Sequence, residues 1–246
     1  MKRLPTRPIS EVAPPPRRFP LTKLRGERVE LDPSIERDAR NAYYEVTLRG
    51  KRRPDLEEVI RKSPEHAYLY AQNIIKDKWP DGEKTILDHM DPEWIFKYAK
   101  NVIKHLSRLD RWPEGEKALL TAGDPSWIYK YAAEVIEGEW PEGESIIRQH
   151  PQFAYLYAAN VRHKRWPQAE PIIMRRPSAA YHYAVYVIGD TWPEAEGIMA
   201  NDPFVWPKYQ NFQQLLRAGE GVFEPGAAEV LQVAEAITDH PDIFTS

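Results

Sequence analysis

The sequence predicts an all-α protein whose short two-helix repeats, each about 26 residues long, stack as an α-solenoid behind an extended proline-rich N-terminal arm. Three recurring features predict this fold: a Trp-Pro pair, a second proline downstream of it, and a Tyr-x-Tyr-Ala type segment after that proline. Successive Trp-Pro pairs are 33, 28, 26 and 26 residues apart. A regular internal period of this length is typical of solenoids. The pairs begin at Trp79, Trp112, Trp140, Trp166 and Trp192.

The second proline of each repeat predicts the start of a longer helix of about twelve residues. Proline is favoured at the first helical position, where its missing N–H costs nothing. A residue of the N-cap type precedes it in Ser63, Asp91, Asp124 and Asp202. In the copy from Pro92 to Lys104, apolar residues follow the i, i+3, i+4, i+7 spacing of one helix face. The paired tyrosines lie two positions apart and therefore point to opposite sides, as expected for a helix between two neighbours.

The Trp-Pro proline predicts a second, shorter helix of about eight to ten residues. Its first turn is acidic, as in Glu114 with Glu116 and Glu142 with Glu144, which suits the positive end of a helix dipole. We interpret these acids as helix-end electrostatics, because they recur at one structural position whereas active sites are single and irregular. The five tryptophans are predicted to be structural residues that fill the corner between the two helices.

Degenerate copies flank the five clear ones and set the predicted domain boundaries. Upstream, residues 42–64 match the pattern with Arg53-Pro54 in place of Trp-Pro. Downstream, Trp206–Tyr209 keeps a tyrosine, and Phe223–Pro225 resembles a degenerate Trp-Pro pair. Residues 226–237 are predicted to form a capping helix. We therefore expect an arm over residues 1–38 and a repeat domain over residues 39–246, with about six units and a C-terminal cap.

One repeat carries an insertion over residues 104–111, and insertions in solenoids fall on one edge, often the binding edge. We name His105, Arg108 and Arg111 as candidate partner-binding residues there. A tolerated loop or an extra helical turn is the alternative explanation.

The N-terminal arm has its own composition. Residues 1–30 hold eight lysines and arginines against three glutamates, a net charge of +5, which leaves −8 for residues 31–246. Six prolines favour extended conformations that cannot build a core. We expect the arm to dock either on the acidic repeat surface of its own chain or on a neighbouring subunit. Candidate contacts in the arm are Arg17, Arg18, Phe19, Lys23 and Arg25.

Composition and motifs argue against several functional classes. The 246 residues are 42% hydrophobic with a net charge of −3, which disfavours bulk attraction to nucleic acid or membrane. The absence of cysteine excludes thiolate nucleophiles and cysteine-ligated metals. No nucleophile elbow, phosphate-binding loop or His-Glu-x-x-His motif is present. We expect no catalytic residues, no metal, no cofactor and no membrane span, and a cytoplasmic location, or the virion if the protein is viral.

The string Tyr131–Glu144, with its Tyr-Ala, Val-Ile and Trp-Pro-Glu elements, resembles tandem Trp-Pro helical-repeat proteins of bacteriophages and large viruses, an uncharacterised family. The resemblance covers roughly residues 42–205. It implies a helical-repeat fold and a viral origin, with no site residues to transfer.

Two functional classes follow. The first is a non-enzymatic protein-binding scaffold, as a viral or phage structural or assembly component whose arm docks on a neighbouring subunit, or as a phage protein that binds a host factor. The second is a nucleic-acid-binding accessory protein that places the cations of its arm on phosphates.

Overall fold

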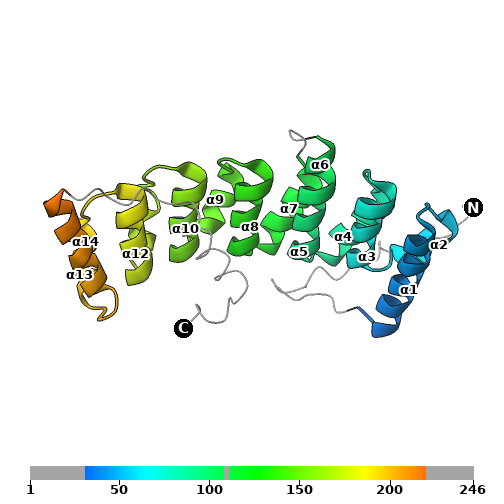
Figure 1. The fold of residues 1–246 in the computed structure, drawn as a ribbon, viewed down its shortest axis with the longest axis horizontal. Helices are drawn as coiled ribbons and strands as arrows, with labels where there is room; N and C mark the ends of the chain where they lie inside the picture. Colours follow the sequence, from blue (N-terminus) through cyan, green and yellow to red (C-terminus); the bar gives the residue numbers. More distant parts are fainter. Residues whose placement is uncertain (1–30, 108–110, 220–246) are drawn as a thin grey trace, which may run out of the picture.

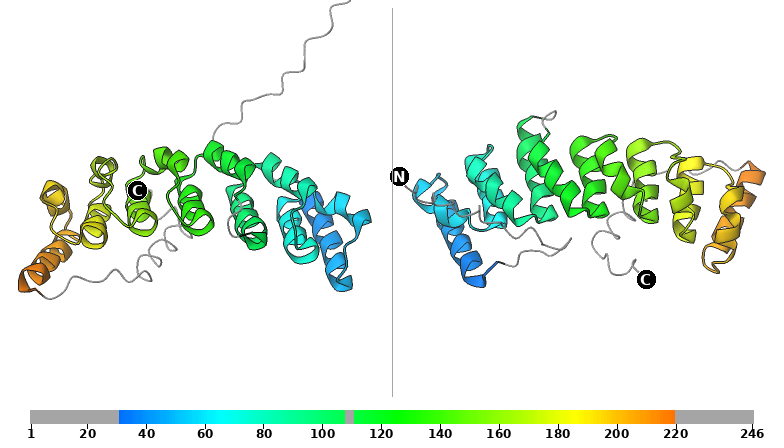
Figure 2. Two further views of the ribbon diagram at one scale, coloured as in Figure 1. Left: turned by 90° about the horizontal axis from the view of Figure 1, so that it is seen from above. Right: turned by 180° about the vertical axis from the view of Figure 1, so that it is seen from behind.

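The protein folds as a single row of antiparallel helix pairs (Figure 1). A computed structural model describes residues 31–107 and 111–219. Within these ranges every regular element is a helix, which confirms the all-α repeat architecture. Seen from above, the row follows an arc (Figure 2). Among the described helices, none has the length and apolar character needed to cross a membrane.

The longer helix of each pair, here called the A-helix, begins at the second proline of the repeat, as predicted. From α3 to α12, each A-helix has a seven-residue α-helical part followed by a π-helical turn. Single π-turns often mark functional sites, but here the turn recurs in five consecutive A-helices and is part of the architecture. These helices are α3 (Pro64–Tyr70) with η1 (Ala71–Ile75), α5 (Pro92–Tyr98) with η2 (Ala99–Ile103), α8 (Pro125–Tyr131) with η3 (Ala132–Ile136), α10 (Pro151–Tyr157) with η4 (Ala158–Arg162), and α12 (Pro177–Tyr183) with η5 (Ala184–Ile188).

The shorter helix of each pair, the B-helix, begins at the Trp-Pro proline in four of the five clear repeats. The exception is α11, where residues 167–169 form a turn and the helix starts only at Glu170. Pro171 explains the delay, because it has no backbone N–H to donate to the carbonyl of Pro167, and the first turn after the Trp-Pro pair therefore lacks that helical hydrogen bond. The B-helices are α2 (Pro54–Ile60), α4 (Pro80–His89), α7 (Pro113–Ala122), α9 (Pro141–Ile147), α11 (Glu170–Ile173) and α13 (Pro193–Ala200).

The row begins earlier than the sequence predicted. Helix α1 (Pro33–Arg49) starts inside the segment assigned to the arm, because Asp32 caps it by accepting a hydrogen bond from the Ser34 backbone N–H. The boundary at residue 38 is therefore wrong, and the helical domain starts at Pro33. At the other end the row reaches α14 (Trp206–Ala218). The predicted capping helix over residues 226–237 lies outside the described residues, and so does the degenerate Trp-Pro pair at residues 223–225.

A tyrosine hydroxyl joins the two helices of each pair. The Tyr98 hydroxyl accepts a hydrogen bond from the Trp79 backbone N–H at 2.8 Å and donates one to Glu83 Oε1 at 2.9 Å. We call this arrangement the tyrosine bridge. Trp79 is the N-cap residue of α4, and the tyrosine hydroxyl satisfies its backbone N–H, which has no partner within the helix. Both tyrosine contacts recur at Tyr70, Tyr157, Tyr183 and Tyr209, with Arg53 replacing tryptophan as the donor to Tyr70, and the bond to glutamate recurs at Tyr131.

The repeat tryptophans form the core of the row. Their exposed fractions lie between 1 and 4%: Trp79, Trp112, Trp140, Trp166 and Trp192. Each ring packs on the bridge tyrosine of the preceding unit, with centroid distances of 5.0–5.2 Å. A bridge tyrosine therefore bonds the tryptophan of its own pair and packs against the tryptophan of the next, which holds successive units together.

Glycine lies under the tryptophan ring in three units. A Cβ atom at Gly82 would come within 2.5 Å of Trp79 Cε3, and the same conflict arises at Gly115 and Gly143. The ring therefore packs directly on the backbone of the first turn of the B-helix. Alanine takes this position in two later units, at Ala169 and Ala195, and both are fully buried.

Candidate functional site: a groove beside the extended A-helix

One of the five A-helices with a π-turn ends differently from the other four. In four units the residue after the π-turn adopts a left-handed conformation that stops the helix: Lys76, Glu137, His163 and Gly189. The equivalent residue in the unit with the insertion is Lys104, whose φ of −66° is right-handed helical. The helix therefore continues into α6 (Lys104–Leu106), which rises above its neighbours (Figure 1). The insertion is thus an extra helical turn followed by residues 108–110, which lie outside the described ranges.

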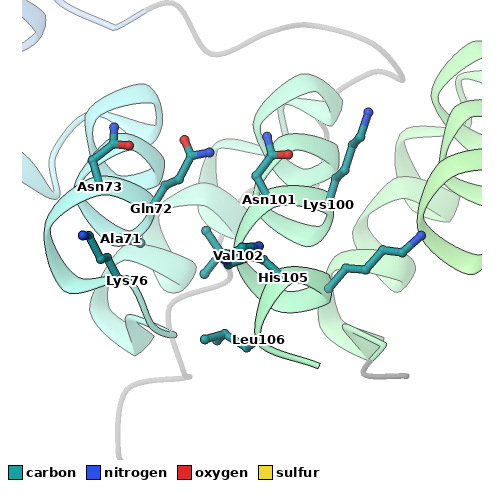
Figure 3. A pocket seen from close by; sticks show the side chains of 10 residues that line it. Ala71, Gln72, Asn73, Lys76, Lys100, Asn101, Val102, His105 and Leu106 are labelled. Atoms are coloured by element: carbon teal, nitrogen blue, oxygen red, sulfur yellow. The ribbon is translucent and has the colours of Figure 1, made fainter. Parts of the chain in front are cut away.

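This extra turn makes one wall of a groove of about 710 Å³ against the shorter A-helix α3–η1 (Figure 3). Ala71 and Val102 contribute apolar surface, and Leu106 adds a side chain that is 41% exposed. The remaining lining residues are amides and cationic or titratable side chains, with no carboxylate among them: Gln72, Asn73, Lys76, Lys100, Asn101, Lys104 and His105.

Two of the groove lysines are held by acids of the next unit. Lys100 Nζ pairs with a carboxylate oxygen of Glu134, and Lys104 Nζ lies 2.7 Å from Glu137 Oε1. Lys104 Nζ also donates to the Glu134 carbonyl oxygen at 2.7 Å. Lys76, by contrast, is exposed and makes no ion pair with any described residue. It is the least compensated positive charge in the groove.

Two asparagines of the groove belong to a series of amides along the A-helices. Asn73 Nδ2 donates to the Tyr43 hydroxyl at 2.9 Å, and Asn101 Nδ2 donates to the Tyr68 hydroxyl at 2.8 Å. Asn160 makes the same bond to Tyr129 at 2.7 Å, outside the groove. In each case the tyrosine comes from the preceding A-helix. We call these three bonds the asparagine ladder.

The candidate residues of the insertion lie in different surroundings. His105 lines the groove and is exposed. Arg111 instead binds Glu116 with two hydrogen bonds, from Nε at 2.7 Å and Nη2 at 2.6 Å. Arg52 with Glu57 and Arg165 with Glu170 repeat this pairing, so it belongs to the repeat rather than to the insertion. Arg108 and the arm residues Arg17, Arg18, Phe19, Lys23 and Arg25 lie outside the described residues.

The repeated acids have a role that the sequence analysis missed. Glu116 and Glu144 accept hydrogen bonds from Tyr131 and Tyr157 as members of tyrosine bridges. Burial raises the pKa of these tyrosines, and the neighbouring carboxylate raises it further. The recurrence of a glutamate 13 or 15 residues before the second tyrosine of each pair is the signal that would have revealed this pairing. The groove asparagines were also missed, although Asn73, Asn101 and Asn160 each follow the first aromatic residue of the pair by five positions.

One cluster of potential metal ligands is present among the described residues: Glu36, Glu65 and His66, whose ligand atoms lie within 4.8 Å of one another. His66 Nδ1 is 2.9 Å from Glu36 Oε1 and 3.0 Å from Ser63 Oγ, and Ser63 caps α3. At this repeat position other units carry Trp94, Trp127 or Phe153. The cluster is explained as a packing contact between α1 and α3.

Comparison of the chain with protein-family models, with curated proteins and with solved structures gave no match.

Proposed function

We propose that this chain is a non-enzymatic helical-repeat protein that mediates protein–protein interaction, as a structural or assembly component. The groove beside α6 carries this proposal, because it arises where one unit departs from the repeat. The bridge tyrosines and their glutamates, by contrast, serve packing in every unit. We also propose that this component is viral, and that part of the proposal rests on the sequence resemblance alone.

Partly exposed side chains on the A-helices support the proposal of a protein partner. Trp94 and Trp127 are partly exposed on adjacent A-helices, with Lys97 Nζ and Lys130 Nζ lying 4.3 and 4.8 Å from the ring centroids. Tryptophan is enriched among the residues that dominate binding energy in protein interfaces.

The basic N-terminal arm supports the proposed role in assembly. Helix α1 lies at one end of the row (Figure 1). Residues 1–30 precede this helix in the sequence, and their net charge of +5 favours binding to an acidic surface of a neighbouring subunit.

Light scattering on the purified chain, with and without residues 1–30, tests this role. An oligomeric full chain and a monomeric truncated chain are the expected result. If both are monomeric, docking on a second copy is refuted, and a host or other foreign protein becomes the partner to seek by crosslinking.

Nucleic-acid binding through the arm is the second candidate, because Arg17, Arg18, Lys23, Arg25 and Arg28 are five cations within a short segment. Phosphate contacts release counterions, so this function requires an affinity that falls steeply as salt rises. Binding of a labelled oligonucleotide measured across a salt series distinguishes the two candidates. An affinity that does not change with salt excludes the second.

A further inference from the structure

We infer that the groove beside α6 receives an extended acidic segment of a partner protein, with Asn73 and Asn101 bonding its backbone and Lys76 facing its acidic side chains. This inference rests on the proposed function and names the chemistry of the partner at that site.

The asparagine ladder supplies preorganised backbone-binding groups. An asparagine side chain has two N–H donors and a carbonyl acceptor. In Asn73 and Asn101 one N–H is used by the tyrosine of the preceding A-helix, which fixes the plane of the amide. Neither side chain makes another hydrogen bond among the described residues, and the two point the same way from adjacent helices (Figure 3). Amides that are already oriented lose less entropy when they bind a ligand.

The spacing of the ladder fits an extended polypeptide. Packed helices lie about 8–10 Å apart, and an extended chain in the polyproline II conformation advances about 3.1 Å per residue with three residues per turn. A segment of this kind that crosses from η1 to η2 therefore presents equivalent backbone groups to the two asparagines at about every third residue. Each amide can then accept from a backbone N–H and donate to a backbone carbonyl of the bound segment.

The charge of the groove selects an acidic segment. The described residues that line it include three lysines and His105 but no carboxylate. Lys100 and Lys104 are held by Glu134 and Glu137, so Lys76 is the cation that a bound acid would compensate most directly. Leu106, with Val102 beneath it, offers an apolar wall for one side chain of the segment. Among the described residues, no phenylalanine, tyrosine or tryptophan lines the groove, and this lining therefore lacks the stacking platforms typical of single-stranded nucleic-acid sites.

The direct test measures binding of a short fluorescein-labelled peptide of alternating glutamate and leucine to the full chain by fluorescence anisotropy. Lys76→Glu reverses the uncompensated charge and is expected to weaken binding about fivefold or more. Lys84→Glu is the matched control, because it makes the same change of net charge at an exposed position of α4 away from the groove.

Asn101→Ala and Asn160→Ala form a second matched pair. Each variant loses one ladder bond to a tyrosine, at 2.8 and 2.7 Å, so their structural costs are comparable. Only Asn101 lines the groove. Asn101→Ala should weaken peptide binding about fivefold, whereas Asn160→Ala should change it by less than about twofold.

Several outcomes overturn the inference: no measurable binding, equal losses within either matched pair, or equal binding of a peptide with glutamine in place of glutamate. Equal binding of an oligothymidylate assigns the groove to nucleic acid. Binding that appears only after removal of residues 220–246, which hold six acidic residues and no lysine or arginine, makes the chain's own segment the occupant. Loss of peptide binding with unchanged dependence of mass on the arm refutes this inference and leaves the proposed assembly role standing.

Discussion

Phe96 and Glu134 occupy the two positions that form a rung of the asparagine ladder elsewhere in the row. Three other pairs place a tyrosine hydroxyl opposite an asparagine of the next A-helix, at 2.7–2.9 Å. Where phenylalanine removes the hydroxyl, the asparagine is replaced as well, and Glu134 pairs with Lys100 instead. Both differences from the ladder therefore lie at one contact between units.

This shared contact predicts that the two positions are coupled in a double-mutant cycle. Phe96→Tyr alone places a hydroxyl beside Glu134, and Glu134→Asn alone leaves an amide without a hydroxyl and frees Lys100. Together they restore the rung, so we expect a favourable interaction energy of about 1 kcal/mol. Urea unfolding of the four proteins measures it. Additive effects of the two substitutions would show that the rung contributes nothing.

The tyrosine bridge predicts a large effect from the loss of one oxygen atom. Tyr98→Phe leaves the Trp79 N–H and the Glu83 carboxylate without this partner in the hairpin. We expect the free energy of unfolding to fall by about 1–3 kcal/mol, since unsatisfied buried polar groups are costly. Tyr129→Phe is the control, because its hydroxyl makes a single ladder bond and the chain already carries phenylalanine at that repeat position. Equal losses in both variants would contradict the special role of the bridge.

Truncation of a repeat tryptophan should destabilise the row strongly. Trp140 is 1% exposed, and Trp140→Ala is expected to cost about 3–5 kcal/mol through the cavity it leaves. Trp127 is partly exposed, so Trp127→Ala should cost distinctly less. Thermal denaturation of both variants checks the order, and the reverse order would refute the assignment of these tryptophans to core and surface.

The burial of His182 predicts that the folded protein loses stability at acid pH. Burial lowers its pKa from 6.5 to about 4, with a smaller contribution from Lys208, and its ring lies among Tyr155, Tyr181 and Tyr186. In the unfolded chain this histidine binds a proton as pH falls below 6.5, whereas in the folded protein it stays neutral until about pH 4. Folding stability should therefore decrease by about 3 kcal/mol as pH falls through that window.

The variant His182→Leu isolates this effect, because Leu69 and Leu156 occupy the same repeat position in other units. The difference in unfolding free energy between variant and wild type, measured by urea unfolding at several pH values, should grow in favour of the variant on acidification. A difference that does not change between pH 7 and pH 4.5 would show that His182 is protonated in the folded state.

Local patterns alone determined the helical repeat. Prolines at first helical positions, the caps at Ser63, Asp91 and Asp124, and the apolar spacing of the A-helices act within a few residues of the chain. Each therefore predicts its element without knowledge of the rest of the fold. The burial of the tryptophans follows from the same repeat, because an apolar residue between two short helices is covered when they pack.

Contacts between helices were decided only by the tertiary structure. Glu116 reads as a helix-end charge from sequence, but it accepts a hydrogen bond from Tyr131, fifteen residues away, once the hairpin closes. Asn101 meets Tyr68 across 33 residues, and the groove exists only because α6 continues where the neighbouring helix stops at Lys76. Local spacing determines which residues form a helix and which face is apolar. Which polar residues meet across two helices depends on the length of each helix and on the register in which the pairs stack. Packing of the whole row sets this length and this register.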